Sequence, residues 1–232
     1  MDQHSLRKTF KYKLQPTAAQ ERELARVLGL CRSLYNAGLE QRITAWQRCQ
    51  VSVSRYDQEA ELKAIRAEFA EYAAIHRHVL HDVLARLEKT YHAFFRRVQR
   101  GERAGFPRFT GRERFHSFTF KEYGNGAQLD NGFLVFSKIG RIAVRWSRPL
   151  EGTPKTVTIR QEADGWYVPF SCVDVPMKPL PRTGQETGID LGLESFATLA
   201  DGSQIANPRI FQVGELNLKR AQRRVSRRQQ SS

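Results

Sequence analysis

Cysteine, acidic residues and long apolar runs are all scarce in this sequence of 232 residues. The three cysteines (Cys31, Cys49 and Cys172) show no short pair spacing. This argues against a disulfide framework and a zinc ribbon, and it indicates a reducing compartment. No apolar run approaches the roughly 20 residues that span a bilayer, and the N-terminus lacks a secretory signal. We therefore expect a soluble, cytoplasmic protein without a membrane partner.

The acidic residues are outnumbered by basic ones, with 24 Asp and Glu against 38 Lys and Arg and a formal net charge of +14. Such an excess predicts a polyanionic partner, because Lys and Arg displace counterions from phosphates. A ribosome-like or membrane-surface protein would share this charge. Acidic lipid is disfavoured because no helical segment is apolar on one face and uniformly basic on the other. Nucleic acid is the predicted ligand.

The first segment with a clear pattern runs from Leu6 to Leu14 and alternates with period two, which predicts a strand. One face is mostly apolar and the other is basic, and Pro16 ends the strand. A basic face suits a phosphate backbone. The candidate nucleic-acid contacts of this strand are Lys11 and Lys13 on the basic face and Lys8 on the mostly apolar face.

Three amphipathic helices are expected next. Thr17 and Gln20 form a capping-box signal before the first, whose apolar stripe extends to Trp46. After an interruption at residues 50–55, the second carries Leu62, Ile65, Phe69 and Tyr72, and the third carries apolar residues from Val79 to Val98. Each helix has one apolar stripe to bury, so the three are expected to form a bundle.

Beyond Gly101 the pattern changes to an exposed connection and then to short strands. The expected strands are Phe118–Lys121, Phe133–Ser137, Arg141–Trp146, Lys155–Gln161 and Trp166–Asp174, the last two joined by an Asp164-Gly165 turn. Short strands with frequent glycine turns predict a small barrel or sandwich. Because the first strand has no partner among the helices, we expect it to join this later sheet, with the helical bundle as an insertion.

A proline-containing linker at 175–186 precedes a last unit. Strands are expected at Thr187–Leu191, Phe196–Leu199 and Gln204–Asn207, followed by a helix from Glu215. These few strands and one helix cannot bury a core by themselves, and the unit is therefore expected to be incomplete. Its helix has six cations in ten residues, which favours a phosphate partner over a solvated face: Lys219, Arg220, Arg223, Arg224, Arg227 and Arg228.

Aromatic and arginine residues are interleaved between residues 94 and 120, a pattern typical of nucleic-acid binding. Four of the aromatics fit apolar positions of a helix or strand and are interpreted as core: Phe94, Phe95, Phe118 and Phe120. The arginines are then the functional part. The candidates are Arg108, Arg112 and Arg114.

Asp190 lies in the segment Thr187–Leu193, a carboxylate on a short strand between two glycines. This is how ribonuclease-H-like folds present their first metal ligand, although an ordinary Asp near a strand end fits as well. Two-metal cleavage needs several carboxylates, and Glu186, Glu194 and Asp201 are not well placed to complete the set. His78 and His81 could share a ligand, but without Cys or HExxH spacing they are interpreted as surface or RNA-contacting residues.

Five blocks in this order resemble the transposon-associated TnpB (OrfB) family of RNA-guided DNA nucleases, which is related to type V CRISPR effectors. The blocks are KTFKYKLQPTAAQ, GLCRSLYNAGLEQ, LEKTYHAFFRRVQRGERAGFPRFTGRERFHSFTF, GIDLGLESFATLADG and LKRAQRRVSRR. The resemblance spans nearly the whole chain, from the first block at residue 8 to the end of the last at residue 228. In the second block, Arg32, Tyr35 and Asn36 become candidate nucleic-acid contacts through this resemblance.

The resemblance implies an α+β fold: a small split β-barrel (wedge) of residues 1–15 and 112–180, with a helical recognition domain at 16–111. The start of a ribonuclease-H-like (RuvC) α/β domain would follow at 181–232. It also implies guide RNA and target DNA as partners, a bacterial or archaeal cytosol, and Asp190 as the first catalytic and metal (Mg²⁺) residue. The later catalytic residues and zinc ribbon of the family have no counterpart in this sequence. We therefore expect a truncated, cleavage-inactive nuclease or, alternatively, a nuclease-dead RNA-guided DNA-binding repressor, of undetermined oligomeric state.

Overall fold

The computed structural model describes residues 5–179, 181, 184 and 186–230. The chain divides into two compact units, Met1–Lys178 and Pro179–Ser232. Within the described residues, no helix is long and apolar enough to cross a bilayer.

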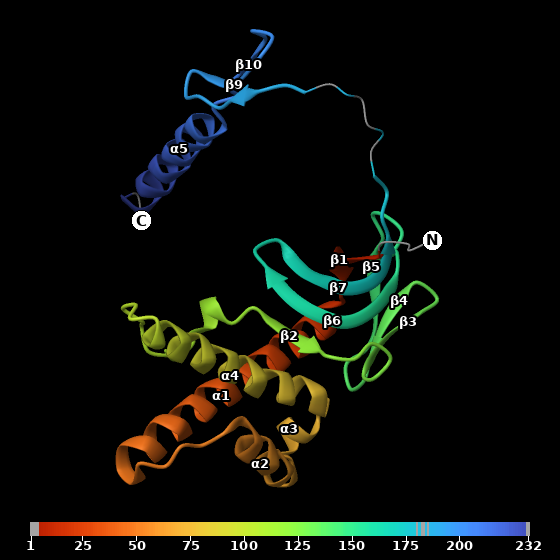
Figure 1. Ribbon diagram of the computed structural model, residues 1–232, viewed down its shortest axis with the longest axis vertical. Helices are drawn as coiled ribbons and strands as arrows, with labels where there is room; N and C mark the ends of the chain where they lie inside the picture. Colours follow the sequence, from red (N-terminus) through yellow and green to blue (C-terminus); the bar gives the residue numbers. More distant parts are fainter. Residues whose placement is uncertain (1–4, 180, 182–183, 185, 231–232) are drawn as a thin grey trace. The chain divides into compact units, whose positions relative to one another are not determined.

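Seven antiparallel strands form the sheet of the first unit, in the order β2-β6-β7-β1-β5-β4-β3. Their bounds are Ser5–Gln15 (β1), Ser117–Phe120 (β2), Ala127–Asp130 (β3), Phe133–Phe136 (β4), Gly140–Arg145 (β5), Thr153–Glu162 (β6) and Gly165–Pro176 (β7). Figure 1 shows β6 and β7 as long, curved strands. The sheet forms a nearly closed barrel. It is not fully closed because, among the described residues, no hydrogen-bonded ladder joins its two edge strands, β2 and β3.

β1 is a central strand of this sheet. It pairs with β7 along most of its length and with β5 from Lys13 to Gln15. This confirms that the first strand joins strands that follow it by more than 100 residues. Phe10, Tyr12 and Leu14 are buried, as the period-two pattern predicts, whereas Leu6 lies beyond a register shift and is 45% exposed.

The helices of the first unit are α1 (Ala18–Cys49), α2 (Arg55–Glu68), α3 (Ala70–Ala73) and α4 (Arg77–Gln99). The predicted capping box of Thr17 and Gln20 begins α1. A second box that the sequence analysis did not identify, formed by Ser54 and Asp57, begins α2. α1 and α4 pack side by side (Figure 1). Cys31 lies in their core, where burial raises the pKa of its thiol to about 12, so it is a packing residue.

Arg86 of α4 fixes the helices to the sheet. Its guanidinium donates from Nη1 to the Ser117 carbonyl oxygen at 2.6 Å and from Nη2 to Thr119 Oγ1 at 2.7 Å, both on β2. Its Nε donates to Asp82 at 2.7 Å, which balances the charge. One side chain therefore joins α4 to the edge strand that follows the whole helical insertion.

Two expectations about local structure were wrong, and one strand was missed. The second helix ends at Glu68, because Phe69 adopts an extended conformation, and Tyr72 lies on the short α3. β3 was not predicted. The last helix, α5, begins at Ile210 rather than Glu215.

The second unit contains a three-stranded antiparallel sheet in the order β10-β9-β8 and α5 (Ile210–Gln230). The strands are β8 (Ile189–Asp190), β9 (Ser195–Leu199) and β10 (Gln204–Ala206). Among the described residues of this unit only Ala197 is buried. Large apolar side chains on it are exposed, including Leu191, Leu193, Ile210, Phe211, Leu216 and Leu218. By themselves these elements bury almost no apolar core.

Replacing Arg86 with Ala should lower the free energy of unfolding by about 2–4 kcal/mol, because Asp82 and the polar groups of β2 would lose their partner. Urea unfolding followed by circular dichroism measures the change. Lys89→Ala, an exposed cation on the same helix, is the matched control and should be nearly neutral. Equal unfolding midpoints for the two variants would contradict this role of Arg86.

Candidate nucleic-acid interface

Residues 101–116 connect α4 to β2 and carry three of the predicted arginines. This connection is clamped to α1 by Asn36, whose side-chain Nδ2 donates to the Thr110 carbonyl oxygen at 3.1 Å. The Thr110 backbone N–H donates back to Asn36 Oδ1 at 2.8 Å. Because one amide side chain satisfies both backbone groups of Thr110, it sets the position of the connection.

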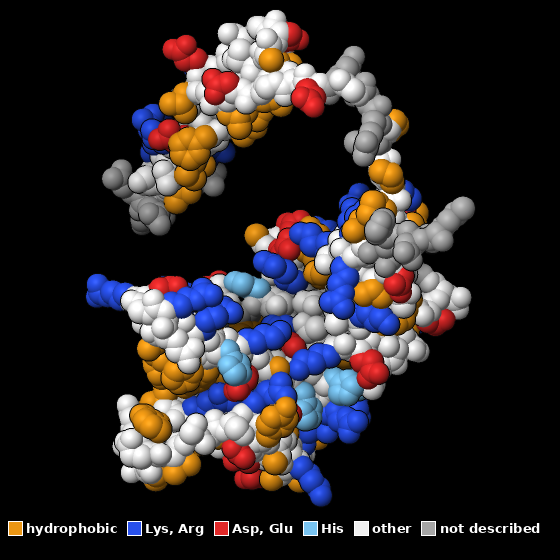
Figure 2. All heavy atoms as spheres, viewed as in Figure 1, with side chains coloured by type: hydrophobic (Ala, Val, Ile, Leu, Met, Phe, Trp, Pro, Cys, Tyr) orange, Lys and Arg blue, Asp and Glu red, His pale blue; other side chains and the backbone are white. Residues whose placement is uncertain are grey.

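Arg108, Arg112 and Arg114 are all exposed on this clamped connection, the last two in a short 3-10 helix, Arg112–Arg114. Within the described residues, none of them forms an ion pair or a side-chain hydrogen bond. Figure 2 shows Lys and Arg side chains over the visible face of the first unit. The connection thus presents three uncompensated positive charges to solvent.

Tyr35 supports the connection from within the core. It is only 8% exposed, its hydroxyl donates to Thr90 Oγ1 at 3.4 Å, and its ring centroid lies 6.1 Å from that of the buried Phe115. The structure therefore gives it no open face on which a base could stack. Asn36 and Tyr35 were predicted to contact nucleic acid directly. In the structure both hold the connection that carries the arginines.

The lysines of β1 have acidic partners on the β6–β7 hairpin. Lys11 Nζ lies 3.1 Å from Glu162, and Lys13 Nζ lies 3.0 Å from Asp164. The hydrogen bond to Asp164 raises the pKa of Lys13, and hydrogen bonds from Tyr167 and then Lys13 lower the pKa of Asp164. These lysines are locally neutralised, which weakens their attraction for phosphate.

The remaining predicted contacts of the first unit differ in setting. Lys8 is exposed, with its Nζ 5.2 Å from the ring centroid of Phe10. Arg32 is half-buried on α1 and has no ion-pair partner among the residues described. Arg32 therefore resembles the arginines of the connection in its lack of a neutralising carboxylate.

In the second unit, Asp190 is exposed at the end of β8. On α5, Lys219 pairs with Glu215 at 2.7 Å, while Arg220, Arg223, Arg224 and Arg227 are exposed. The side chain of Arg228 lies outside the described residues. The basic helix is thus formed, with at least one of its cations paired locally.

The described residues do not fit a metal pair. No group of three or more His, Cys, Asp or Glu side chains in the described part of the chain could hold a metal ion. Asp201 accepts hydrogen bonds from the backbone N–H and the hydroxyl of Ser203, at 2.9 and 2.7 Å. Its carboxylate therefore stabilises the turn that contains it. Asp190 stays a predicted Mg²⁺ ligand, and no cleavage step follows from the residues present.

Two family models match this chain: a helix-turn-helix domain of OrfB proteins over residues 1–50, and a probable OrfB transposase over residues 169–232. A protein of Streptomyces pristinaespiralis, named as a candidate RNA-guided DNA endonuclease, is 35% identical over 234 residues. That match covers 98% of this chain and 56% of the relative. The chain belongs to the OrfB (TnpB) family.

A second OrfB relative is InsQ of Escherichia coli strain K12, with the same description, which is 29% identical over 227 residues. That match covers 94% of this chain and 54% of InsQ. The chain thus spans about half the length of these curated relatives. A Cas12f1–sgRNA–target DNA complex matches at a TM-score of 0.44 and 14% identity, covering 95% of this chain and 61% of that one. This likeness is too low to carry a conclusion.

The OrfB segment described as helix-turn-helix has a different local structure in this chain. Residues 5–49 form one strand and one continuous 32-residue helix, α1, rather than two helices around a turn. The strand enters a β-sheet and the helix enters the bundle. This segment therefore has no separate pair of helices with which to read DNA.

The interpretation of Phe94 and Phe95 as core was wrong. Phe95 is 54% exposed and Phe94 is half-buried, and both border a surface pocket with Phe106. Phe118 and Phe120 are buried as expected. Helical periodicity placed Phe94 and Phe95 on the apolar stripe of α4, whereas strand alternation placed Phe118 and Phe120, and only the second prediction is confirmed.

Asn36→Ala should release the connection while leaving the bundle folded. We expect trypsin to cleave faster after Arg108 and Arg112, because the two hydrogen bonds to Thr110 no longer hold the backbone. Mass spectrometry of timed digests measures the cleavage rates. Ser33→Ala, exposed on the same helix, is the matched control, and equal digestion of the two variants would show that Asn36 is not a clamp.

Proposed function

We propose that residues 1–178 bind guide RNA and target DNA as the nucleic-acid-holding part of an RNA-guided DNA endonuclease of the OrfB family. The observation that carries this proposal is the connection between α4 and β2, where Arg108, Arg112 and Arg114 are exposed, unpaired and fixed by Asn36. A cation held in place without a carboxylate partner can neutralise phosphate without first breaking an ion pair. The net charge of +14 acts in the same direction.

A second candidate function is RNA-guided DNA binding without cleavage, as in a nuclease-dead repressor. The observation that favours it is the isolation of Asp190, which has no metal-binding partners among the described residues. A metal pair requires several carboxylates. We infer that the polypeptide of residues 1–232, taken by itself, binds nucleic acid but does not cut it.

The experiment expresses residues 1–232 with the DNA that flanks the gene, purifies the protein at moderate salt and sequences the bound RNA. One discrete transcript from that flanking DNA is the expected result. The triple variant Arg108→Ala, Arg112→Ala and Arg114→Ala should lower the slope of log affinity against log salt by about 2–3. Incubation of the loaded protein with matching DNA and Mg²⁺ should give binding without cleavage.

The matched control replaces three exposed lysines outside the connection, Lys63, Lys89 and Lys155, with Ala, which removes the same charge. Equal salt slopes for the two triple variants would contradict a localised interface. Heterogeneous RNA, released by a modest rise in salt, would mean that only the overall charge acts and would overturn guide RNA binding. DNA cleavage by residues 1–232 would overturn the binding-only alternative.

A further inference from the structure

An aromatic pocket of about 690 Å³ lies on the helical part of the first unit. It lies between the last turns of α1, the loop before α2, the last turns of α4 and Phe106 of the connection. Its lining residues are Arg42, Ile43, Trp46, Gln47, Val51, Ser52, Val53, Ser54, Glu88, Tyr91, His92, Phe94, Phe95 and Phe106. The volume falls within the roughly 300–1,000 Å³ of small-molecule sites.

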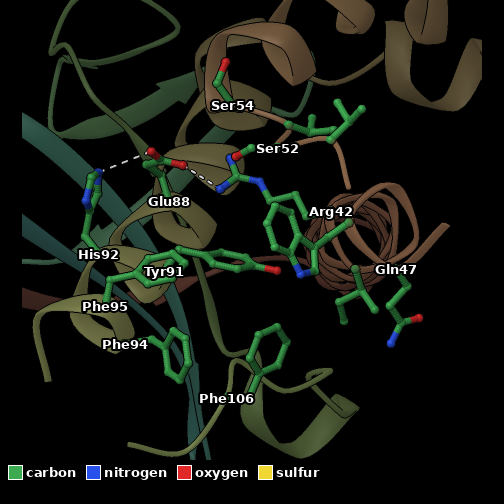
Figure 3. A pocket seen from close by; sticks show the side chains of 14 residues that line it. Arg42, Gln47, Ser52, Ser54, Glu88, Tyr91, His92, Phe94, Phe95 and Phe106 are labelled. Carbon is green, nitrogen blue, oxygen red and sulfur yellow. Dashed lines mark ion pairs between the residues drawn. The ribbon is translucent and has the colours of Figure 1, made fainter. Parts of the chain in front are cut away.

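Aromatic rings form one side of this pocket, as Figure 3 shows for Tyr91, Phe94, Phe95 and Phe106. The centroid of Phe106 lies 5.3 Å from that of Phe94 and 5.9 Å from that of Tyr91, so the rings support one another. Trp46 is 56% exposed and contacts no other ring among the described residues. An exposed indole beside a braced ring cluster offers a flat apolar surface, which is suited to a planar ligand.

A buried cation lies in the wall of the aromatic pocket. Arg42 is 8% exposed, its Nη1 lies 2.6 Å from Glu88, and its guanidinium carbon lies 5.0 Å from the Tyr91 ring centroid. Its Nη2 has no hydrogen-bond partner among the described residues. A buried N–H without a partner costs free energy, and a hydrogen-bond acceptor on a ligand that reached it would offset that cost.

We propose that the aromatic pocket binds one unstacked nucleobase of a single-stranded nucleic acid. Its parts match such a ligand: rings for the base faces, a guanidinium for an edge acceptor and cations for the phosphate. Figure 2 shows apolar side chains between the ends of α1 and α4 with Lys and Arg side chains on both sides. A lipid chain or an apolar peptide would leave Arg42 unsatisfied. The inference rests on the proposed nucleic-acid binding and adds a base-reading element to it.

The test measures the affinity of residues 1–232 for oligouridine RNA, for oligothymidine DNA and for the same two backbones without bases. Trp46→Ala should weaken binding to the base-containing strands about tenfold, the size of one aromatic–base contact, and leave binding to the abasic strands unchanged. The matched control is Tyr56→Ala, which removes a ring that is 72% exposed on α2 outside the pocket, and it should change neither affinity. Ultraviolet crosslinking of 5-iodouridine strands should label peptides that contain Trp46 or Phe106.

Each outcome decides the inference. A larger loss for RNA than for DNA, or the reverse, supports base binding and identifies which strand enters. Equal affinity of wild type and Trp46→Ala for the base-containing strands overturns base binding in the aromatic pocket. If both proteins still bind the abasic strands in that case, the proposed function stands. A wild-type chain that binds neither kind of strand contradicts the proposed function itself. Loss of a dimer or of thermal stability in Trp46→Ala, without a change in affinity, shows that protein fills the pocket and overturns the inference.

Discussion

The pairing of β1 with β7 and β5 is the constraint on which the rest of the first unit depends. β1 must leave the sheet at Gln15, and α1 begins at Ala18, so the path of α1 is set where it leaves the sheet. Gln20 reinforces this by donating to the Arg141 carbonyl oxygen of β5 at 2.7 Å. At the other end of the insertion, Arg86 ties α4 to β2. The helices are therefore anchored to one sheet at both ends, despite a separation of about a hundred residues.

This anchoring explains why an irregular connection can carry functional arginines. Segments without secondary structure are usually more mobile than the helices and strands that they connect. Residues 101–116 are held by Asn36 at Thr110 and by burial of Phe115 against Tyr35. Both anchoring residues belong to α1, whose own position is set by β1. The orientation of the arginines thus follows from strand pairing at a distance.

Local signals in the sequence predicted the elements well, and long-range partners explain the failures. The alternation around Phe10 and the capping box at Thr17 depend on neighbours within a few residues, so they could be read directly. The acidic partners of Lys11 and Lys13 are 151 residues away, and no periodicity reveals them. Tyr35 packs against the distant Phe115, and the helical pattern around it did not reveal this burial. The lack of a partner for the first strand among the helices predicted the split sheet, and the family resemblance supplied the barrel, which the strand pattern left open against a sandwich.

The total of 38 lysines and arginines therefore overstates how many cations can attract phosphate. Lys11, Lys13 and Lys219 each have a carboxylate within about 3 Å, and Arg42 and Arg86 hold the fold together through theirs. For such a cation, binding phosphate means losing an existing ion pair, so the net gain is small. Arg32 and the three arginines of the connection meet no such cost. These four arginines lie on α1 and on the connection, which the sheet holds in a fixed position, and they are therefore available to phosphate. Recognition by this chain then depends on where charge is left uncompensated, more than on how much charge it carries.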